Sequence, residues 1–180
     1  MGFKKEPNNS GEINLIYSGN LNDRIDWVLF ESICKALTPY NGKLHIAGST
    51  IRRPEEMKAL LEQPNCVYHG VVNEKQLLRL LQHMDFAVIP HIEDKISKFM
   101  DPIKLKMYKK LGLVSLSTKL PGLPENDPAL VIADSPSGFI DELEKMLSNH
   151  GSLHSLPVNN VFLDDIGEMY SVLIDKLSNN

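Results

Sequence analysis

Ile13-Asn-Leu-Ile-Tyr-Ser-Gly-Asn20 is the stretch from which the fold can be worked out. Its first five residues are apolar apart from Asn14, and Ser18-Gly19-Asn20 then ends the run, which is typical of a buried strand that stops at a tight turn. A helical pattern follows, and its apolar face consists of Ile25, Leu29, Ile33 and Leu37. A strand, a turn and an amphipathic helix in this order are the first half of a βαβ unit.

The same alternation continues along the chain. Short apolar runs predict further strands at Leu44–Ala47, Cys66–Tyr68, Phe86–Ile89, Leu113–Ser117 and Leu130–Ala133. Helix-start signals lie between or after them at Pro54, Asn73 with Gln76, Pro102 and Ser135-Pro136. Because unbroken apolar strands need cover on both faces, the sequence predicts an α/β fold with a doubly wound, mostly parallel Rossmann-like sheet and helices on both faces.

The length of 180 residues fits one domain. We expect residues 1–12 to be a flexible lead-in, residues 13–180 to form a single Rossmann-like domain, and residues 161–180 to be a C-terminal helix. The N-terminus carries charge with no apolar segment after it, so no signal peptide is predicted and we expect a cytoplasmic protein.

Composition narrows the function classes. Hydrophobic residues make up 42% and charged residues 23%, which excludes a disordered tail, a collagen-like fibre and a coiled coil. The net charge of −4 provides no basic excess for a phosphate backbone, so no nucleic-acid partner is predicted. Cys34 and Cys66 form no CxxC motif and no histidine pair has metal spacing, so no metal site is predicted.

Two loops are candidate ligand sites, because ligands of open parallel sheets bind beyond the carboxyl ends of the strands. After the first strand, Gly19 lets the backbone approach a phosphate, and Arg24 follows close behind; a simple turn with a solvated arginine is the alternative. The second loop runs from His91 to Lys104, carries three lysines and ends at a helix N-terminus, which favours an anion; a merely solvated loop is its alternative. GxGxxG and the Walker pattern are absent, which disfavours an ordinary dehydrogenase or P-loop ATPase.

A family resemblance lies in the second half of the chain. Asp101-Pro-Ile-Lys-Leu-Lys-Met-Tyr-Lys-Lys-Leu-Gly112 and Val114-Ser-Leu-Ser-Thr-Lys-Leu-Pro-Gly122 resemble the stretch "NPxKxxEYLAxGxPVVxTxLPG" of GT-B glycosyltransferases, near the family 4-like, teichuronic-acid-type group. Further matching landmarks fall in order at Tyr17–Asp26, Leu44–Gly48, Asn65–Val71 and Asp85–Pro90.

The resemblance implies the C-terminal, donor-binding half of a transferase that moves a hexosyl group from a UDP- or GDP-linked sugar to a polysaccharide or glycolipid acceptor. The nucleotide sugar is the substrate, and no further cofactor is expected. The expected phosphate-binding residues are Gly19, Arg24, Lys98 and Lys104. The expected base and ribose region comprises Gly70, Val71, Val72 and Met107, and the expected sugar-binding cleft comprises His91, Asp101 and Pro102. No catalytic residue is assigned.

One departure from the family pattern concerns the ribose. The glutamate expected to hold the ribose hydroxyls aligns with Met107, which cannot accept those bonds. An active transferase with a shifted ribose contact, a weakly binding member and an inactive half that serves assembly are all compatible with this change.

The partners follow from the same resemblance. We expect an N-terminal acceptor-binding domain that this chain lacks, little or no transfer by the 180 residues alone, and a full-length enzyme for which peripheral membrane association is left open. The alternatives from other classes are a non-enzymatic α/β nucleotide-binding or interaction module and one half of a nucleotide-sugar epimerase.

Overall fold

The structure, a computed structural model, describes residues 11–50, 52–92, 103–124 and 126–150. The predictions for Lys98, Asp101 and Pro102, for most of the lead-in and for the helix at residues 161–180 lie outside these described residues.

Six parallel strands form one sheet in the order β3-β2-β1-β4-β5-β6. The strands are β1 (Ile13–Ser18), β2 (Gly42–Ala47), β3 (Cys66–Tyr68), β4 (Phe86–Ile89), β5 (Val114–Thr118) and β6 (Leu130–Ala133). The chain adds β2 and then β3 on one side of β1, returns to the other side of β1 with β4, and continues outward to β5 and β6. This order is that of a doubly wound Rossmann-like sheet, and it confirms the predicted fold class.

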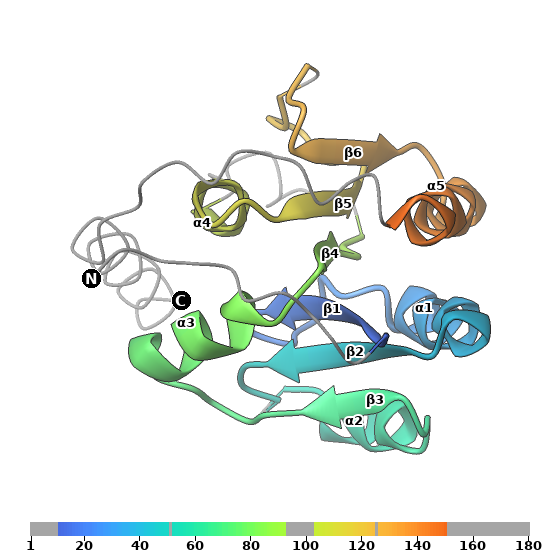
Figure 1. Ribbon diagram of the computed structural model, residues 1–180. Coiled ribbons are helices and arrows are strands. Elements are labelled where there is room, and N and C mark those ends of the chain that lie inside the picture. Colours follow the sequence, from blue (N-terminus) through green and yellow to red (C-terminus); the bar gives the residue numbers. More distant parts are fainter. Residues whose placement is uncertain (1–10, 51, 93–102, 125, 151–180) are drawn as a thin grey trace.

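Helices cover both faces of the sheet. They are α1 (Trp27–Leu37), the 3-10 helix η1 (Thr38–Tyr40), α2 (Pro54–Leu61), α3 (Glu74–Gln82), α4 (Ile103–Lys110) and α5 (Pro136–Ser148). Figure 1 shows α1 and α5 on one side of the sheet and α3 and α4 on the other. Within the described ranges, no helix combines the length and the apolar character that crossing a bilayer requires.

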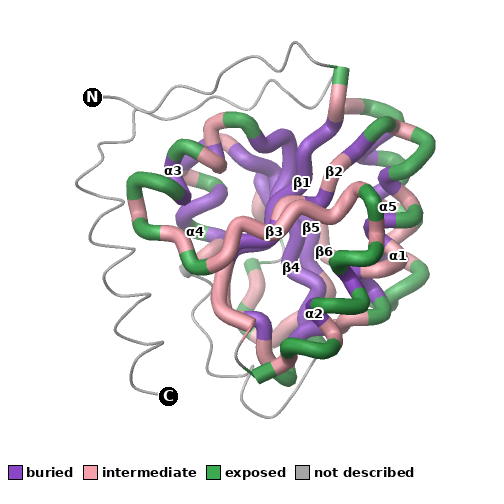
Figure 2. Tube along the Cα trace, turned by 90° about the horizontal axis from the view of Figure 1, so that it is seen from below, coloured by how far each residue is buried: buried purple, intermediate pink, exposed green. Residues whose placement is uncertain are grey.

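Two apolar clusters, one on each face, hold these layers together. Leu15 and Tyr17 of β1 belong to the cluster under α1, α2 and α5, and Ile16 between them belongs to the cluster under α3 and α4. Figure 2 shows the central strands as buried and the outward-facing parts of the helices as exposed. A strand buried on both faces explains why its sequence is almost continuously apolar.

The local start signals act as the sequence predicts. Asn73 and Gln76 form a complete capping box at α3, and the Ser135 hydroxyl accepts the backbone N–H of Gly138 at the start of α5. Helix α1 begins later than the prediction at Ile25, because the Asp26 side chain caps it by accepting the N–H of Leu29.

Candidate functional site

The candidate site lies where β1 and β4 are neighbours in the sheet although α1 to α3 separate them in the sequence. A crevice beyond the carboxyl ends of two such strands, at the switch point of the winding, is the usual ligand site of this architecture. Gly19 directly follows β1, and His91 follows β4 after Pro90. Lys104, in the first turn of α4, reaches the same point, because its amine contacts Tyr17 near the end of β1.

Two glycines shape the backbone at this edge. Gly19 and Gly48 have φ angles of +142° and +153°, in the region that side-chain-bearing residues rarely adopt. The N–H of Gly19 donates to the carbonyl of Ala47, and the N–H of Gly48 donates to the carbonyl of Gly70, each at 2.8 Å. A Cβ atom at Gly48 would overlap the carbonyl oxygen of Gly19. The loops after β1, β2 and β3 are therefore held together through backbone contacts that only glycine permits.

Lys104 lies across the end of β1, in the space that Gly19 leaves open. A Cβ atom at Gly19 would overlap the Lys104 amine. The Nζ atom donates to the Tyr17 hydroxyl at 2.9 Å and lies 4.3 Å from the centroid of the same ring. The ammonium therefore has both a hydrogen-bond acceptor and a cation–π contact from one buried side chain.

His91 completes this group from the β4 side. It is 6% exposed, and its Nε2 atom lies 3.1 Å from the Tyr17 hydroxyl. Its backbone N–H donates to Oγ1 of Thr118 at 3.2 Å, and that hydroxyl donates to the His91 carbonyl at 2.6 Å. Thr118 ends β5, so β5 holds the backbone of His91 while Tyr17 of β1 contacts its imidazole.

Electrostatics distinguish the two basic groups of the site. Burial and, after it, the nearby positive charge of Arg24 lower the pKa of Lys104 to about 7. Burial, with the charges of Lys104 and Arg24, also holds the pKa of His91 well below its usual value. His91 is therefore neutral at physiological pH, whereas Lys104 titrates there and would gain its proton when an anion binds.

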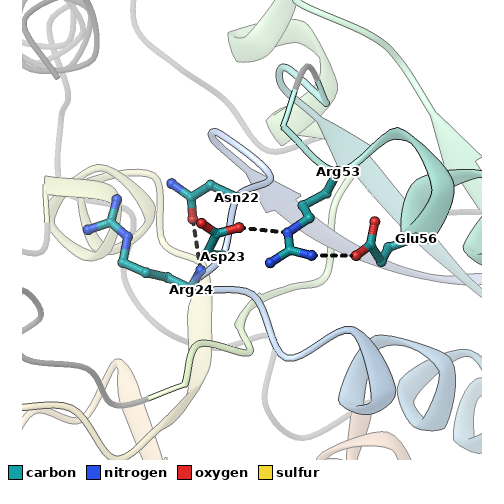
Figure 3. A network of polar contacts seen from close by, with 5 residues as sticks. All are labelled: Asn22, Asp23, Arg24, Arg53 and Glu56. Carbon is teal, nitrogen blue, oxygen red and sulfur yellow. Dashed lines mark hydrogen bonds and ion pairs between the residues drawn. The ribbon is translucent and has the colours of Figure 1, made fainter.

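Arg24 belongs to the turn between β1 and α1. Its backbone N–H donates to Oδ1 of Asn22 at 3.1 Å. Its side chain points away from the neighbouring ion pairs, in which Arg53 contacts Asp23 at 2.6 Å and Glu56 at 2.7 Å (Figure 3). Asp23 thus has Arg53 as a cationic partner, and the Arg24 charge contributes to the lowered pKa of both Lys104 and His91.

The residues predicted for the base and ribose separate into two groups. Gly70 lies two residues after the end of β3, and Val71 beside it is 78% exposed. Val72 packs against the cluster under α3 and α4, and Met107 is 3% exposed inside that cluster. Met107 therefore packs as a core residue between α4 and the sheet.

Sequence reasoning missed a histidine pair on the α3 face of the sheet. His45 Nδ1 lies 2.9 Å from His69 Nε2, the rings stack with an interplanar angle of 10°, and His45 Nε2 lies 3.1 Å from Oδ1 of Asn14. Burial, and next the neighbouring His69, lower the pKa of His45 to about 4. The register offers the missing signal: His45 is paired with Val67, so His69, two residues further on, emerges on the same face.

Tyr17 was also missed as a site residue. The sequence shows it only as the apolar end of a strand, and its contact with Lys104 spans 87 positions. Tyr108 of α4 makes a similar long-range contact, accepting the Ser18 N–H at 2.9 Å and lying 2.8 Å from the Ser18 hydroxyl.

Solved structures with the same fold include several glycosyltransferases. The lipopolysaccharide outer core galactosyltransferase WaaB, in its apo form, has a TM-score of 0.58 at 11% identity, over 94% of this chain and 51% of that one. WaaG, a glycosyltransferase involved in lipopolysaccharide biosynthesis, has a TM-score of 0.60 at 14% identity, over 82% of this chain and 40% of that one. The catalytic domain of starch synthase IV from Arabidopsis thaliana, bound to ADP and acarbose, has a TM-score of 0.60 at 12% identity, over 92% of this chain and 38% of that one. The chain spans about half or less of these structures, and at such identities the likeness shows the fold.

Comparison with curated protein sequences finds no match. A family model described as "Glycosyl transferases group 1" matches residues 12–149, from just before β1 to just after α5. This match includes every described strand and helix and the whole of the Tyr17–His91–Lys104 group. The chain therefore belongs to the glycosyl transferases group 1 family.

Proposed function

We propose that the chain is the donor-binding half of a GT-B glycosyltransferase of the family 4-like, teichuronic-acid-type group. It binds a UDP- or GDP-linked sugar, whose hexosyl group passes to a polysaccharide or glycolipid acceptor. One observation carries the proposal: in a chain of the group 1 family, the Lys104 amine lies beside Gly19 at the switch point of the sheet, near enough to Arg24 for that charge to lower its pKa. Positive charge at that crevice suits a diphosphate.

The chemistry of glycosyl transfer fits this arrangement. An acceptor hydroxyl attacks the anomeric carbon as the bond between that carbon and the diphosphate oxygen breaks. Negative charge then grows on the leaving diphosphate, where a fixed cation stabilises the transition state. Lys104 is the best-placed group, because its amine is held in position before any ligand binds.

An acceptor-binding domain is the implied partner. The chain spans 51%, 40% and 38% of the first three solved structures with this fold, which leaves room for a second domain in each. We place that domain N-terminal to this chain in the full-length enzyme, in the cytoplasm, with a peripheral membrane position left open. Accordingly, the 180 residues should bind donor but transfer little or no sugar.

Isothermal titration calorimetry with UDP, GDP and their sugars tests the donor-site proposal. ADP belongs in the series because the matching starch synthase structure contains it. Lys104→Met should weaken binding of the preferred nucleotide about tenfold or more, since a charge-assisted hydrogen bond contributes roughly 1.5–3 kcal/mol. Lys145→Met is the matched control, because Lys145 lies in the last turn of α5, where it pairs with Glu142 and contacts none of Tyr17, His91 and Lys104, and it should leave the affinity unchanged.

Two outcomes would contradict the proposal. If no nucleotide binds at millimolar concentration, the non-enzymatic module becomes the better account of the chain. Equal losses of nucleotide affinity in Lys104→Met and Lys145→Met would show that Lys104 does not belong to the donor site. Product analysis with the full-length protein separates a transferase from an epimerase, because only the transferase consumes the acceptor.

A further inference from the structure

Tyr17 is fully buried at the end of β1 and contacts both basic groups of the site. We propose that Tyr17 is a positioning residue, whose hydroxyl and ring hold the Lys104 amine at the crevice so that its remaining N–H groups meet the diphosphate of the donor. This inference rests on the proposed donor site and deepens it, since it names what prepares the cation.

The hydrogen bonds around the Tyr17 oxygen fix its orientation. A phenol has one proton to donate and can accept two hydrogen bonds. The oxygen lies 3.1 Å from the Asn20 carbonyl, which can only accept, so the proton goes there. Lys104 at 2.9 Å and His91 Nε2 at 3.1 Å then both act as donors. His91 fits this role as a neutral imidazole with its proton on Nε2, so all three contacts are satisfied together.

These contacts restrict the motion of the Lys104 amine but occupy only part of its hydrogen-bonding capacity. A protonated lysine has three N–H donors, and Tyr17 takes one of them. The aromatic ring supports the charge from one side, and the amine occupies the space that the missing side chain of Gly19 leaves. Two donors remain for an anion, and the side chain loses little further freedom when that anion binds.

The phenol also has rigid support of its own. Its ring meets Phe30 edge to face at a centroid distance of 5.4 Å and His91 at 5.8 Å. Both neighbours are buried, and β1 itself is buried along its whole length. A loop residue in the same role would let the amine move, whereas Tyr17 is held by the core.

The decisive variant is Tyr17→Phe, which keeps the ring and removes only the hydroxyl. We expect calorimetry at pH 7 to show about tenfold weaker binding of both UDP and inorganic pyrophosphate. We also expect the 13Cε resonance of Lys104, in lysine-labelled protein without ligand, to titrate closer to an ordinary lysine, because the released amine moves into solvent. Adding Tyr17→Phe to Lys104→Met should cause no further loss, since the hydroxyl acts through that amine.

Tyr108→Phe is the matched control. Tyr108 is equally buried and near the same strand end, but its hydroxyl bonds Ser18. It should leave the Lys104 titration and both affinities unchanged. A second variant, His91→Leu, leaves Tyr17 and Lys104 in place and removes one donor to the phenol. We expect it to weaken pyrophosphate binding relative to the wild type, and this comparison provides the measurement if Tyr17→Phe does not fold.

The results separate the two proposals. Unchanged affinities and an unchanged Lys104 titration in Tyr17→Phe would overturn the positioning role, even if the wild type binds UDP. Equal losses in Tyr17→Phe and Tyr108→Phe would overturn it as well, because any loosening of the strand end would then suffice. If the wild type binds no nucleotide, the donor site fails, and the pyrophosphate and lysine measurements still decide the role of Tyr17.

Discussion

Gly48→Ala should destabilise the fold much more than an ordinary loop substitution does. Gly48 follows β2 with φ of +153°, and a Cβ atom there would overlap the Gly19 carbonyl oxygen, a backbone atom. The backbone therefore has to move, and it does so at the point where the loops after β1, β2 and β3 are joined.

The expected loss has two parts. Holding alanine in a backbone region that is almost specific to glycine costs about 1–3 kcal/mol. The hydrogen bonds from Gly19 to Ala47, from Gly48 to Gly70 and from Tyr68 to the Gly48 carbonyl, at 2.8, 2.8 and 2.7 Å, pass through the displaced segment. If two of them break, at about 0.5–1.5 kcal/mol each, the sum is roughly 2–6 kcal/mol. That is a large part of the roughly 5–15 kcal/mol typical of a whole domain.

Urea denaturation monitored by circular dichroism measures this loss. Gly122→Ala is the control, because Gly122 also has a positive φ, +83°, but no atom lies within 4 Å of the position of its Cβ. Gly122→Ala should therefore lower the free energy of unfolding by about 1–2 kcal/mol, through the unfavourable backbone conformation alone. A difference of less than about 1 kcal/mol between Gly48→Ala and Gly122→Ala would refute the close-approach explanation.

Two other perturbations concern buried groups. Met107→Glu should lower the free energy of unfolding at pH 7 by about 3 kcal/mol or more, because it puts a carboxylate into the cluster under α3 and α4. This loss of stability should shrink toward pH 4, as the buried carboxyl group takes up a proton. The control Met107→Leu should lower the free energy of unfolding by less than about 1.5 kcal/mol. The wild-type protein should lose stability as the pH falls from 6.5 to about 4, since the folded state keeps His45 unprotonated in that range while the unfolded chain binds the proton. His45→Leu removes this group and should make the loss smaller. Urea denaturation of the two proteins across this pH range measures the effect, and the same pH dependence in both would contradict it.

Most of the fold was predictable because its signals are local. The strands Cys66–Tyr68, Phe86–Ile89 and Leu130–Ala133 have the predicted bounds, since each is a short apolar run closed by polar or turn residues. The capping box at Asn73 needs only four consecutive residues. By contrast, the strand order is set by crossovers between distant segments, and only the general rules of doubly wound sheets indicate it.

The candidate site was predictable as a place but less so as a set of contacts. Gly19, His91 and Lys104 follow from the rule that ligands bind beyond the carboxyl ends of parallel strands. The rule says nothing about Tyr17, whose ring belongs to the core while its hydroxyl accepts a hydrogen bond from the Lys104 amine. A strand-end tyrosine has the sequence signature of a core residue, so its polar atom becomes informative only when its neighbours in space are known.

The role of Gly19 changes for the same reason. Sequence reasoning assigns its missing side chain to the ligand, because a phosphate can then approach the backbone. In the structure, the space beside Gly19 holds the Lys104 amine, which a Cβ atom would displace. The two roles are compatible, since the amine that fills this space is itself the group proposed to meet the diphosphate. In a chain with a net charge of −4, one glycine, one tyrosine and one lysine thus bring a positive charge to the end of the central strand, which is the feature that the proposed anion site requires.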